Sequence, residues 1–340
     1  DNFSHYTPVA GYADLRRAVC TKLKRDNNLD YGPENILVST GAKQSIANAV
    51  LAIADAGDEV IIPTPFWVTY SEIVKLAGGK VVLVKSTVKN NFKITAQQLE
   101  AAITAKTKLF MFSSPCNPSG AVYSKEELNG LAEVFKQHPA IYILSDEIYE
   151  HINYIGKHES IAQFDFLKER VILINGLSKA FAMTGWRLGY FAANTEIVKA
   201  CDKIQGQFTS AACSITQRAA IEALTGNLQP TQLMIEEFRK RRARVMELVK
   251  DIPGFICNEP PGAFYIFPDV SYYFGKKTSK GETIANADDL CMYLLNEAHV
   301  TTVSGKGFGE PHCIRISFAN SLENIEKGFK KITGALAQLS

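Results

Sequence analysis

Short apolar runs separated by longer stretches of mixed polarity dominate residues 35–191. Each run has three or four residues, is almost wholly apolar and is followed by a segment that fits a helix or a turn. The runs are residues 36–38, 59–62, 81–84, 109–112, 142–144 and 171–174. Strands that are apolar along their whole length are buried on both faces, and strands that alternate with helices form parallel sheets. The pattern predicts an α/β fold with a mostly parallel sheet between two layers of helices.

Two helices of this region are well marked. Residues 42–55 directly follow the first apolar run. The segment Ser124-Lys125-Glu126-Glu127 has the capping-box pattern, in which the Ser hydroxyl and the Glu carboxylate each bind a free amide of the first turn. We expect the helix that it opens to end near His138.

The pattern changes after residue 229. A long helix with charges of both signs is predicted for residues 230–250, and a final helix for residues 322–339. Between them we predict a helix over residues 288–298, an exposed loop over 272–286, and strands over 255–257, 263–266, 300–303 and 313–316. The chain is therefore predicted to form a large domain (1–229) and a connector helix with a smaller α+β domain (230–340).

Composition narrows the functional classes. The 340 residues are 46% apolar and 21% charged, with a formal net charge of +2, so charge indicates neither nucleic acid nor a membrane surface as a partner. No apolar run approaches the ~18 residues of a membrane span. Seven cysteines without a Cys-x-x-Cys pair favour reduced thiols in the cytoplasm, and six scattered histidines give no metal-binding spacing.

Lys179 follows the apolar run 171–174 and is the first candidate for chemistry. Burial at the end of such a strand lowers the pKa of an amine and frees it to act as nucleophile or base. Arg187, eight residues later, offers a guanidinium suited to phosphate. A lone lysine in this position is usually an ordinary surface residue. Paired with Arg187, it has the chemistry of a Schiff-base lysine beside a phosphate anchor, which pyridoxal 5'-phosphate (PLP) requires.

Polar residues also follow other predicted strands, and parallel sheets bind ligands at the carboxyl ends of their strands. Asp146 follows the run 142–144, Tyr149 lies three residues later, and Asn117 follows the run 109–112. Gly41 and Ala42 open a helix, whose free amides suit a phosphate. Taken alone, a buried Asp with a nearby Tyr and an Asn-Pro turn are usually structural features. A strand-to-helix turn alone is as often an ordinary turn as a phosphate site.

Residues 176–189 resemble the lysine-attachment signature of class I and II aminotransferases, in which Gly176, Ser178, Arg187, Leu188 and Gly189 fill the required places around Lys179. The resemblance runs from Tyr6 to the last helix and is strongest to the bacterial-type aspartate aminotransferases. It implies PLP fold type I, with a seven-stranded type of sheet. Gly176 departs from the pattern, because many relatives have a phosphate-binding Ser there. The chain starts at Asp1, so we expect the arm that closes over substrate in this family to lie outside the printed sequence.

The resemblance also implies individual roles. Lys179 would carry PLP, Asp146 would pair with its ring nitrogen, and Asn117 and Tyr149 would reach its phenolic oxygen, with Trp67 stacked on the ring. Phosphate contacts would come from Gly41, Ala42, Ser178, Arg187 and, across a homodimer interface, Tyr6. Substrate contacts would come from Arg315 at the α-carboxylate, Lys43 at the distal carboxylate, Trp67 and Asn117. No metal is expected.

The implied reaction is transamination between L-aspartate and 2-oxoglutarate, which gives oxaloacetate and L-glutamate. Prephenate, aromatic or neutral amino acids, and a PLP-dependent β-lyase reaction stay open as alternatives on the same fold. A nucleotide-binding oxidoreductase is disfavoured, because the glycine-rich segment 305–309 lies near the C-terminus and is followed by Glu310. An inactive binding module is disfavoured by the presence of Lys179, Asp146 and Arg315.

Overall fold

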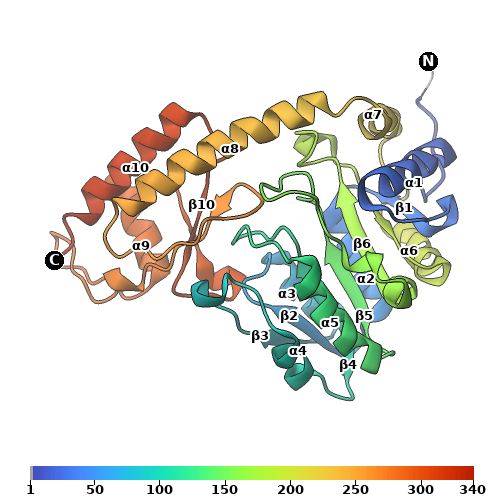
Figure 1. Ribbon diagram of the computed structural model, residues 1–340, viewed down its shortest axis with the longest axis horizontal. Coiled ribbons are helices and arrows are strands. Elements are labelled where there is room, and N and C mark those ends of the chain that lie inside the picture. The colour runs from blue at the N-terminus through green and yellow to red at the C-terminus, as the bar shows by residue number, and fades with distance from the viewer. Residues whose placement is uncertain (1–2) are drawn as a thin grey trace.

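The computed structural model describes residues 3–340, and a seven-stranded sheet forms its centre (Figure 1). The strands are β1 (Ile36–Ser39), β2 (Glu59–Pro63), β3 (Lys80–Val84), β4 (Thr107–Ser113), β5 (Tyr142–Asp146), β6 (Val171–Gly176) and β7 (Gly189–Ala192). Their spatial order is β1-β7-β6-β5-β4-β2-β3. Neighbours are parallel except around β7, which runs antiparallel to both β1 and β6. The predicted α/β fold with a mostly parallel sheet is confirmed.

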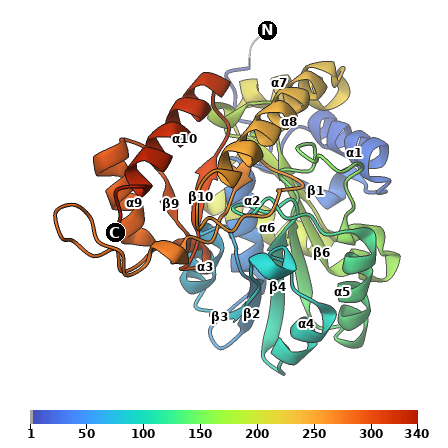
Figure 2. The same cartoon turned by 60° about the vertical axis from the view of Figure 1, so that its left-hand side comes forward.

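Helices cover both faces of this sheet. One layer consists of α1 (Ala13–Asn27), α4 (Ala96–Ala102), α5 (Lys125–Gln137) and α7 (Ser214–Thr225), and the other of α2 (Ala42–Ile53), α3 (Thr69–Leu76) and α6 (Thr195–Phe208). Consecutive residues of β4 alternate between the two cores: Phe110 and Phe112 pack in the first, Leu109 and Met111 in the second. Figure 2 shows α5 and α3 on opposite sides of the sheet. Two-sided burial explains why these strands read as continuous apolar runs.

The capping box predicted at residue 124 is present. The Ser124 hydroxyl accepts from the amide of Glu127 at 3.3 Å, and the Glu127 carboxylate accepts from the amide of Ser124 at 2.7 Å. Helix α5 therefore begins and ends where the sequence predicts.

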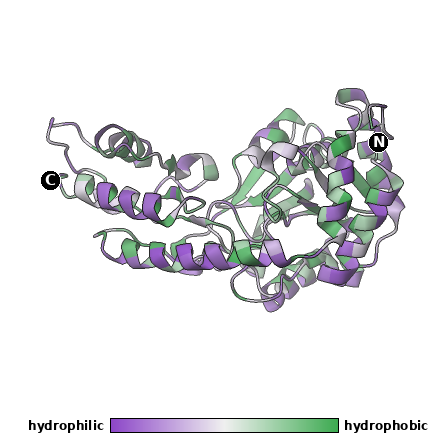
Figure 3. Cartoon of the chain, turned by 90° about the horizontal axis from the view of Figure 1, so that it is seen from above, coloured by the Kyte–Doolittle hydropathy of each residue, from purple (hydrophilic) through white to green (hydrophobic). Residues whose placement is uncertain are grey.

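A second region follows helix α8 (Gln229–Lys250), which leads away from the sheet (Figure 1) and alternates hydrophilic and hydrophobic residues along its length (Figure 3). This region contains β8 (Tyr265–Ile266), β9 (Val303–Ser304) and β10 (Ile314–Ser317) in the order β8-β10-β9, with α9 (Ala287–Tyr293) and α10 (Leu322–Leu336). Its core includes Phe238, Leu290, Ile316 and Phe329 and is continuous with the segment after β5, through Ile148, Tyr149, Ile152 and Tyr154. The division into domains at residues 229 and 230 stays a prediction, and residues 1–2 of the larger part lie outside the described residues.

The strands of this second region are shorter than predicted. Residues 255–257 form no strand; Ile256 makes only an isolated bridge with Asp269. The predicted strand 263–266 shrinks to β8, and 300–303 contributes only its last residue, to β9. Prolines at 260, 261 and 268 remove backbone donors on both sides of β8. The helix predicted over 288–298 is α9 followed by a π-helical turn over Leu294–Ala298. Within the described residues, no helix combines the length and apolar character needed to cross a bilayer.

Candidate active site

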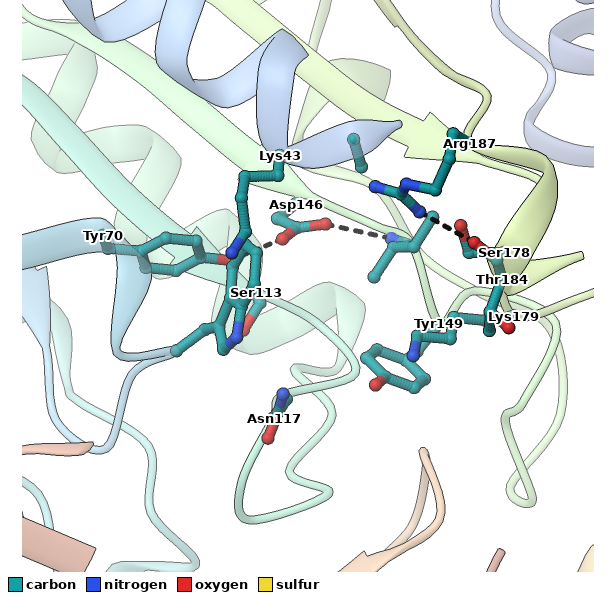
Figure 4. Close-up of a pocket in the computed structure, with 13 residues that line it drawn as sticks. Lys43, Tyr70, Ser113, Asn117, Asp146, Tyr149, Ser178, Lys179, Thr184 and Arg187 are labelled. Atoms are coloured by element: carbon teal, nitrogen blue, oxygen red, sulfur yellow. Dashed lines mark hydrogen bonds between the residues drawn. The ribbon is translucent and has the colours of Figure 1, made fainter. Parts of the chain in front are cut away.

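A cavity of about 200 Å³ opens at the carboxyl ends of β4, β5 and β6 (Figure 4). Parallel pairing places Ser113 level with Asp146, and Asp146 level with Ile174, so the residues that follow these strands meet at one edge of the sheet. Most of the predicted site residues line the cavity: Ala42, Lys43, Trp67, Asn117, Asp146, Tyr149, Ser178, Lys179 and Arg187.

Asp146 forms the floor of the cavity and is only 4% exposed. Its Oδ2 accepts a hydrogen bond from the Tyr70 hydroxyl at 2.6 Å, and its Oδ1 accepts one from the Ile148 amide at 3.2 Å. Burial raises the pKa of Asp146 to about 6, although these hydrogen bonds and the charge of Lys179 act in the opposite direction. A carboxylate in this position is stabilised by a cation that enters the cavity.

Lys179 projects into the same space from the turn after β6. Burial lowers the pKa of its amine, the nearby charges of Arg315 and Arg187 lower it further, and Asp146 opposes them. The Nζ atom lies 5.4 Å from the ring centroids of both Tyr149 and Phe264. The Tyr149 hydroxyl is 2.8 Å from that of Tyr265, and burial raises the pKa of Tyr149 well above its ordinary value. The site thus combines a readily deprotonated amine with a neutral phenol.

The opposite end of the cavity is rich in donors. Arg187 adopts a left-handed backbone conformation with φ 54°, and its Nη1 donates to the Thr184 carbonyl at 2.9 Å. Gly41 precedes helix α2 with φ 86°, and a Cβ on it would come within 2.4 Å of Arg187 Nη2. Only glycine allows this close approach. The guanidinium, the Ser178 hydroxyl and the first amides of α2 together form an anion-binding end.

Three predicted residues lie outside the cavity lining. Gly41 borders it through Ala42. Arg315, on β10, is joined to it through Asn117, since its Nη1 donates to the Asn117 Oδ1 at 2.9 Å. Tyr6 is 99% exposed and borders a separate hollow formed with residues 209–214, so the structure does not bring it into the cavity of its own chain.

Tyr70, Ser113, Ile148 and Thr184 also line the cavity and were missed in the sequence. Tyr70 lies three residues after Trp67, and the two rings meet edge to face at 5.8 Å. Residues three apart at the start of a helix lie on the same face, so this spacing could have identified Tyr70 as a neighbour of Trp67 in the cavity. Ser113 ends the apolar run 109–112, so it could have been found by the same reasoning that found Asp146. Ile148 and Thr184 carry no comparable signal.

Comparison with known proteins identifies the family. The family model described as aminotransferase class I and II matches residues 1–332. A Petunia hybrida protein named bifunctional aspartate aminotransferase and glutamate/aspartate-prephenate aminotransferase is 44% identical over 345 residues, which cover 100% of this chain and 72% of the relative. The aspartate aminotransferase of Bacillus subtilis is 44% identical over 334 residues, covering 98% of this chain and 84% of the relative.

The crystal structure of the aspartate aminotransferase from Rhizobium meliloti has a TM-score of 0.97 with this fold at 42% identity, covering 100% of this chain and 85% of that one. The chain belongs to the class I and II aminotransferases. Its enzymatic class and its cofactor, PLP, follow from that membership.

The cavity of this aminotransferase fits PLP at both ends. PLP carries a phosphate on one side of its ring and a protonatable nitrogen on the other. The donor end at Arg187, Ser178 and α2 suits the phosphate, and the buried Asp146 carboxylate suits a cationic nitrogen. Lys179 supplies an amine with a lowered pKa, the form that a covalent bond to an aldehyde requires.

Proposed function

We propose that this aminotransferase exchanges an amino group between L-aspartate and 2-oxoglutarate. The observation that carries the proposal is a pair of cations on two sides of the cavity. Lys43 lies at its rim, with its Nζ 4.9 Å from the centroid of the Trp67 ring. Arg315 lies beyond Asn117 and bonds to it. Two separate cations match the two carboxylates of a dicarboxylic substrate. The names of the Petunia and Bacillus relatives agree with this assignment.

When bound, PLP supplies an electron sink for the charge left on the substrate Cα after proton loss. We assign the phosphate to Arg187, Ser178, Gly41 and Ala42, the phenolic oxygen to Asn117 and Tyr149, and the ring face to Trp67. Asp146 keeps the ring nitrogen protonated, because its carboxylate is otherwise uncompensated in a buried site.

Lys179 performs the proton transfer in this proposal. After the substrate amine has replaced it, its free Nζ takes the proton from the substrate Cα as a general base. Arg315 grips the α-carboxylate and Lys43 the distal carboxylate, and together they fix which bond at Cα faces Lys179. The lowered pKa of the amine suits this role near neutral pH.

Prephenate is a second candidate substrate, since it is also a dicarboxylate and the Petunia relative carries it in its name. A panel of amino donors with 2-oxoglutarate tests both proposals: L-aspartate, the amino acid formed from prephenate, L-phenylalanine and L-alanine. We expect aspartate to give the highest kcat/KM. Equal values for aspartate and alanine would contradict the assignment of a dicarboxylate site.

We also propose that the enzyme is a homodimer whose two chains share each active site. The supporting feature is an exposed apolar group, the Tyr6 patch (Tyr6, Phe208 and Ile215), of which Phe208 is 72% and Ile215 64% exposed. The last two flank segment 209–214, which shares a hollow with Tyr6. Gln44, next to Lys43, donates to Thr209 Oγ1 at 2.5 Å, so this patch adjoins the cavity rim. Exposed apolar groups of this kind favour contact with another protein surface.

In this arrangement the Tyr6 hydroxyl binds the PLP phosphate of the neighbouring subunit. We expect Tyr6→Phe to weaken PLP retention more than folding. Mixing a Lys179→Ala subunit with a Tyr6→Phe subunit tests the sharing directly. One site of the heterodimer then carries both defects and the other carries neither, so activity returns at half of the sites. If the active sites of the mixture instead retain PLP as weakly as the Tyr6→Phe enzyme does, Tyr6 acts at the cavity of its own chain.

The proposed location is the cytoplasm, supported by free thiols at all seven cysteines. Trapping thiols with an alkylating reagent at the moment of cell lysis tests it. Disulfides recovered in the freshly isolated protein would contradict this location.

A further inference from the structure

Four charged side chains are buried on the reverse side of the turn that carries Asp146 and Tyr149. They are Lys22 (1% exposed), Glu147 (1%), Glu150 (5%) and His158 (7%). Charged residues are rarely buried this completely unless each has a partner. None of the four lines the cavity. We call this group the buried charge cluster.

The geometry of the turn explains how one short segment serves both sides. After β5 the chain forms successive turns, in which the Glu150 amide donates to the Glu147 carbonyl at 2.9 Å and the Ile152 amide donates to the Tyr149 carbonyl at 2.8 Å. In turns of this type, side chains three residues apart lie on the same side. Asp146 and Tyr149 therefore face the cavity, whereas Glu147 and Glu150 face away from it.

The two carboxylates approach each other closely on that reverse side. Oxygen atoms of Glu147 and Glu150 and a ring nitrogen of His158 all lie within 4.8 Å of one another. Two carboxylates at this separation repel in a buried site unless cations balance them. The conformation of the turn therefore depends on cations that compensate Glu147 and Glu150.

Lys22, which comes from α1, compensates Glu150. Its Nζ forms an ion pair with Glu150 Oε1 and donates to Asn27 Oδ1 at 2.8 Å, while Asn27 Nδ2 donates to Glu150 Oε2 at 2.8 Å. Burial alone would raise the pKa of Glu150, but Lys22 and His151 hold it well below its ordinary value. This carboxylate is therefore locked in its charged form and ties the turn to α1.

His158 compensates Glu147 in the same way. Its Nε2 lies 2.8 Å from Glu147 Oε2, and the hydroxyls of Ser145 and Ser160 donate to Glu147 Oε1 at 2.9 and 2.6 Å. Burial alone would lower the pKa of His158, but the Glu147 carboxylate raises it above its ordinary value. Lys22 thus supplies a cation to Glu150, and His158 supplies one to Glu147 when its ring is protonated, a state that the raised pKa favours.

We propose that Lys22 and His158 are positioning residues for catalysis. By neutralising Glu150 and Glu147 they hold the turn in the one conformation that aims Asp146 and Tyr149 into the cavity. This inference rests on the proposed roles of Asp146 and Tyr149. The same charges also act on the site directly, because the negative charge of Glu147 raises the pKa of Asp146.

Other charged groups border the cluster and enter any pH response. Asp26 lies 3.8 Å from Lys22 and 3.7 Å from His151, and Arg25 pairs with Asp26. Burial raises the pKa of Tyr190 and of Tyr31, and the charges of Glu150 and Glu147, respectively, raise them further. Variants of Lys22 and His158 leave all of these groups in place.

The test compares Lys22→Met and His158→Gln with a matched control, Lys24→Met. Lys24 lies on the same helix, but its ammonium pairs with Asp30 at the surface, at 2.7 Å. The measurements on the PLP-loaded enzyme are kcat and KM for L-aspartate and the pH midpoint of the absorption change of bound PLP. We expect a kcat roughly ten- to hundredfold lower in the two cluster variants, as for a modest misplacement of reacting groups, with KM changed less. The midpoint should rise, since an uncompensated carboxylate stabilises positive charge nearby. The control should match the parent in all three.

A double variant, Lys22→Met/Glu150→Gln, keeps the test decisive if Lys22→Met does not fold. It removes both members of the ion pair, so no uncompensated carboxylate stays at residue 150, and both folding and kcat should recover toward the parent. A folded double variant whose kcat is still roughly ten- to hundredfold below that of the parent would overturn the inference, as would folded single variants with the parent's kcat and midpoint.

Asp146→Asn, measured in parallel, separates this inference from the proposed function. If Asp146→Asn binds PLP and turns over like the parent, the proposed role of Asp146 is wrong, and the positioning inference falls with it. If Asp146→Asn is impaired and the Lys22 and His158 variants are not, only the positioning inference is wrong.

Discussion

The two sides of the turn after β5 both face buried ionisable groups, but the pKa values of these groups shift in opposite directions. On the cavity side, burial raises the pKa of Asp146 to about 6 and lowers that of Lys179. On the reverse side, the pKa of Glu150 is held well below its ordinary value and that of His158 above it. Burial disfavours charge on both sides, so partners in direct contact make the difference. The charged forms of Glu150 and His158 are stabilised on the reverse side, whereas the protonation states of Asp146 and Lys179 in the cavity can change.

This difference separates groups that hold structure from groups that react. Glu150 has the Lys22 ammonium within ion-pair distance, and Glu147 has the ring of His158, whose pKa is raised. Asp146 instead accepts from a hydroxyl and an amide; the charge of Lys179 lowers its pKa, but the two form no ion pair among the described residues. A buried acid and a half-buried base that have no ion-pair partner among the described residues are poised to take up a ligand charge and a proton, respectively. The predictions below test that separation.

Removal of Lys179 should have the largest effect and should leave the reverse side untouched. We expect Lys179→Ala to fold and to bind PLP, but to lose transamination by at least about a thousandfold, because one residue serves as both covalent anchor and proton carrier. Steady-state kcat and thermal unfolding, measured together, check this. Near-normal turnover in a folded variant would refute the assignment of Lys179.

The two sides should respond to pH with opposite signs. The folded pKa of Asp146, about 6, lies above its unfolded value, so its favourable contribution is present at low pH and is lost as pH rises through about 6. The depressed pKa of Glu150 has the reverse effect: its contribution is present above the unfolded pKa and is lost as pH falls through the folded one. The Asp146 change is on the order of 2–3 kcal/mol.

Urea unfolding of the PLP-free protein, from pH 7 down to a pH below the unfolded pKa of Glu150, measures both contributions. Relative to the parent, Asp146→Asn should become progressively more stable as pH rises, and Glu150→Gln should lose the extra sensitivity to acid. The same pH slope in both variants would mean that the two sides do not differ.

Lys43 should give a smaller, selective effect, because it is exposed at the cavity rim. We expect Lys43→Ala to lower kcat/KM for aspartate and glutamate. The loss of transition-state stabilisation should be about 2 kcal/mol, the lower end for removal of one member of a charged pair. L-Alanine as amino donor is the internal control and should change little. Equal losses for aspartate and alanine would show that Lys43 only shapes the start of α2.

Most strands of the central sheet were predictable because they are covered on both sides; the edge strand β3, in which Lys80 and Leu83 are exposed, is the exception. Residues of β4 and β6 enter two apolar cores in turn, and that leaves an unmistakable apolar run in the sequence. The short strands β8 and β9 lack such a signal, because prolines and isolated bridges replace continuous pairing around them. Strand β7 was not predicted from the pattern, because none of the apolar runs covers residues 189–192, and a hydrophobic pattern does not record strand direction in any case.

The site residues that could be predicted are likewise those with a local pattern in the sequence. Asp146, Asn117 and Lys179 were found because each follows a strand, and the ends of parallel strands meet at one edge. Lys22 was not found, because it reaches the turn from α1 through an ion pair across 128 positions of sequence. Lys24, Arg25 and Asp26 follow it closely, and nothing in that charged pattern distinguishes a buried lysine from an exposed one. Tertiary contacts of this kind leave no local signal.

The most direct test of the central claim is the absorption spectrum of the PLP-loaded protein before and after addition of L-aspartate, followed by 2-oxoglutarate. We predict that aspartate converts the visible band of the bound pyridoxal form to the shorter-wavelength band of the pyridoxamine form, and that 2-oxoglutarate restores the first. Lys179→Ala should show no such cycle. A spectrum of the parent that aspartate leaves unchanged, or that alanine changes equally well, would contradict the account.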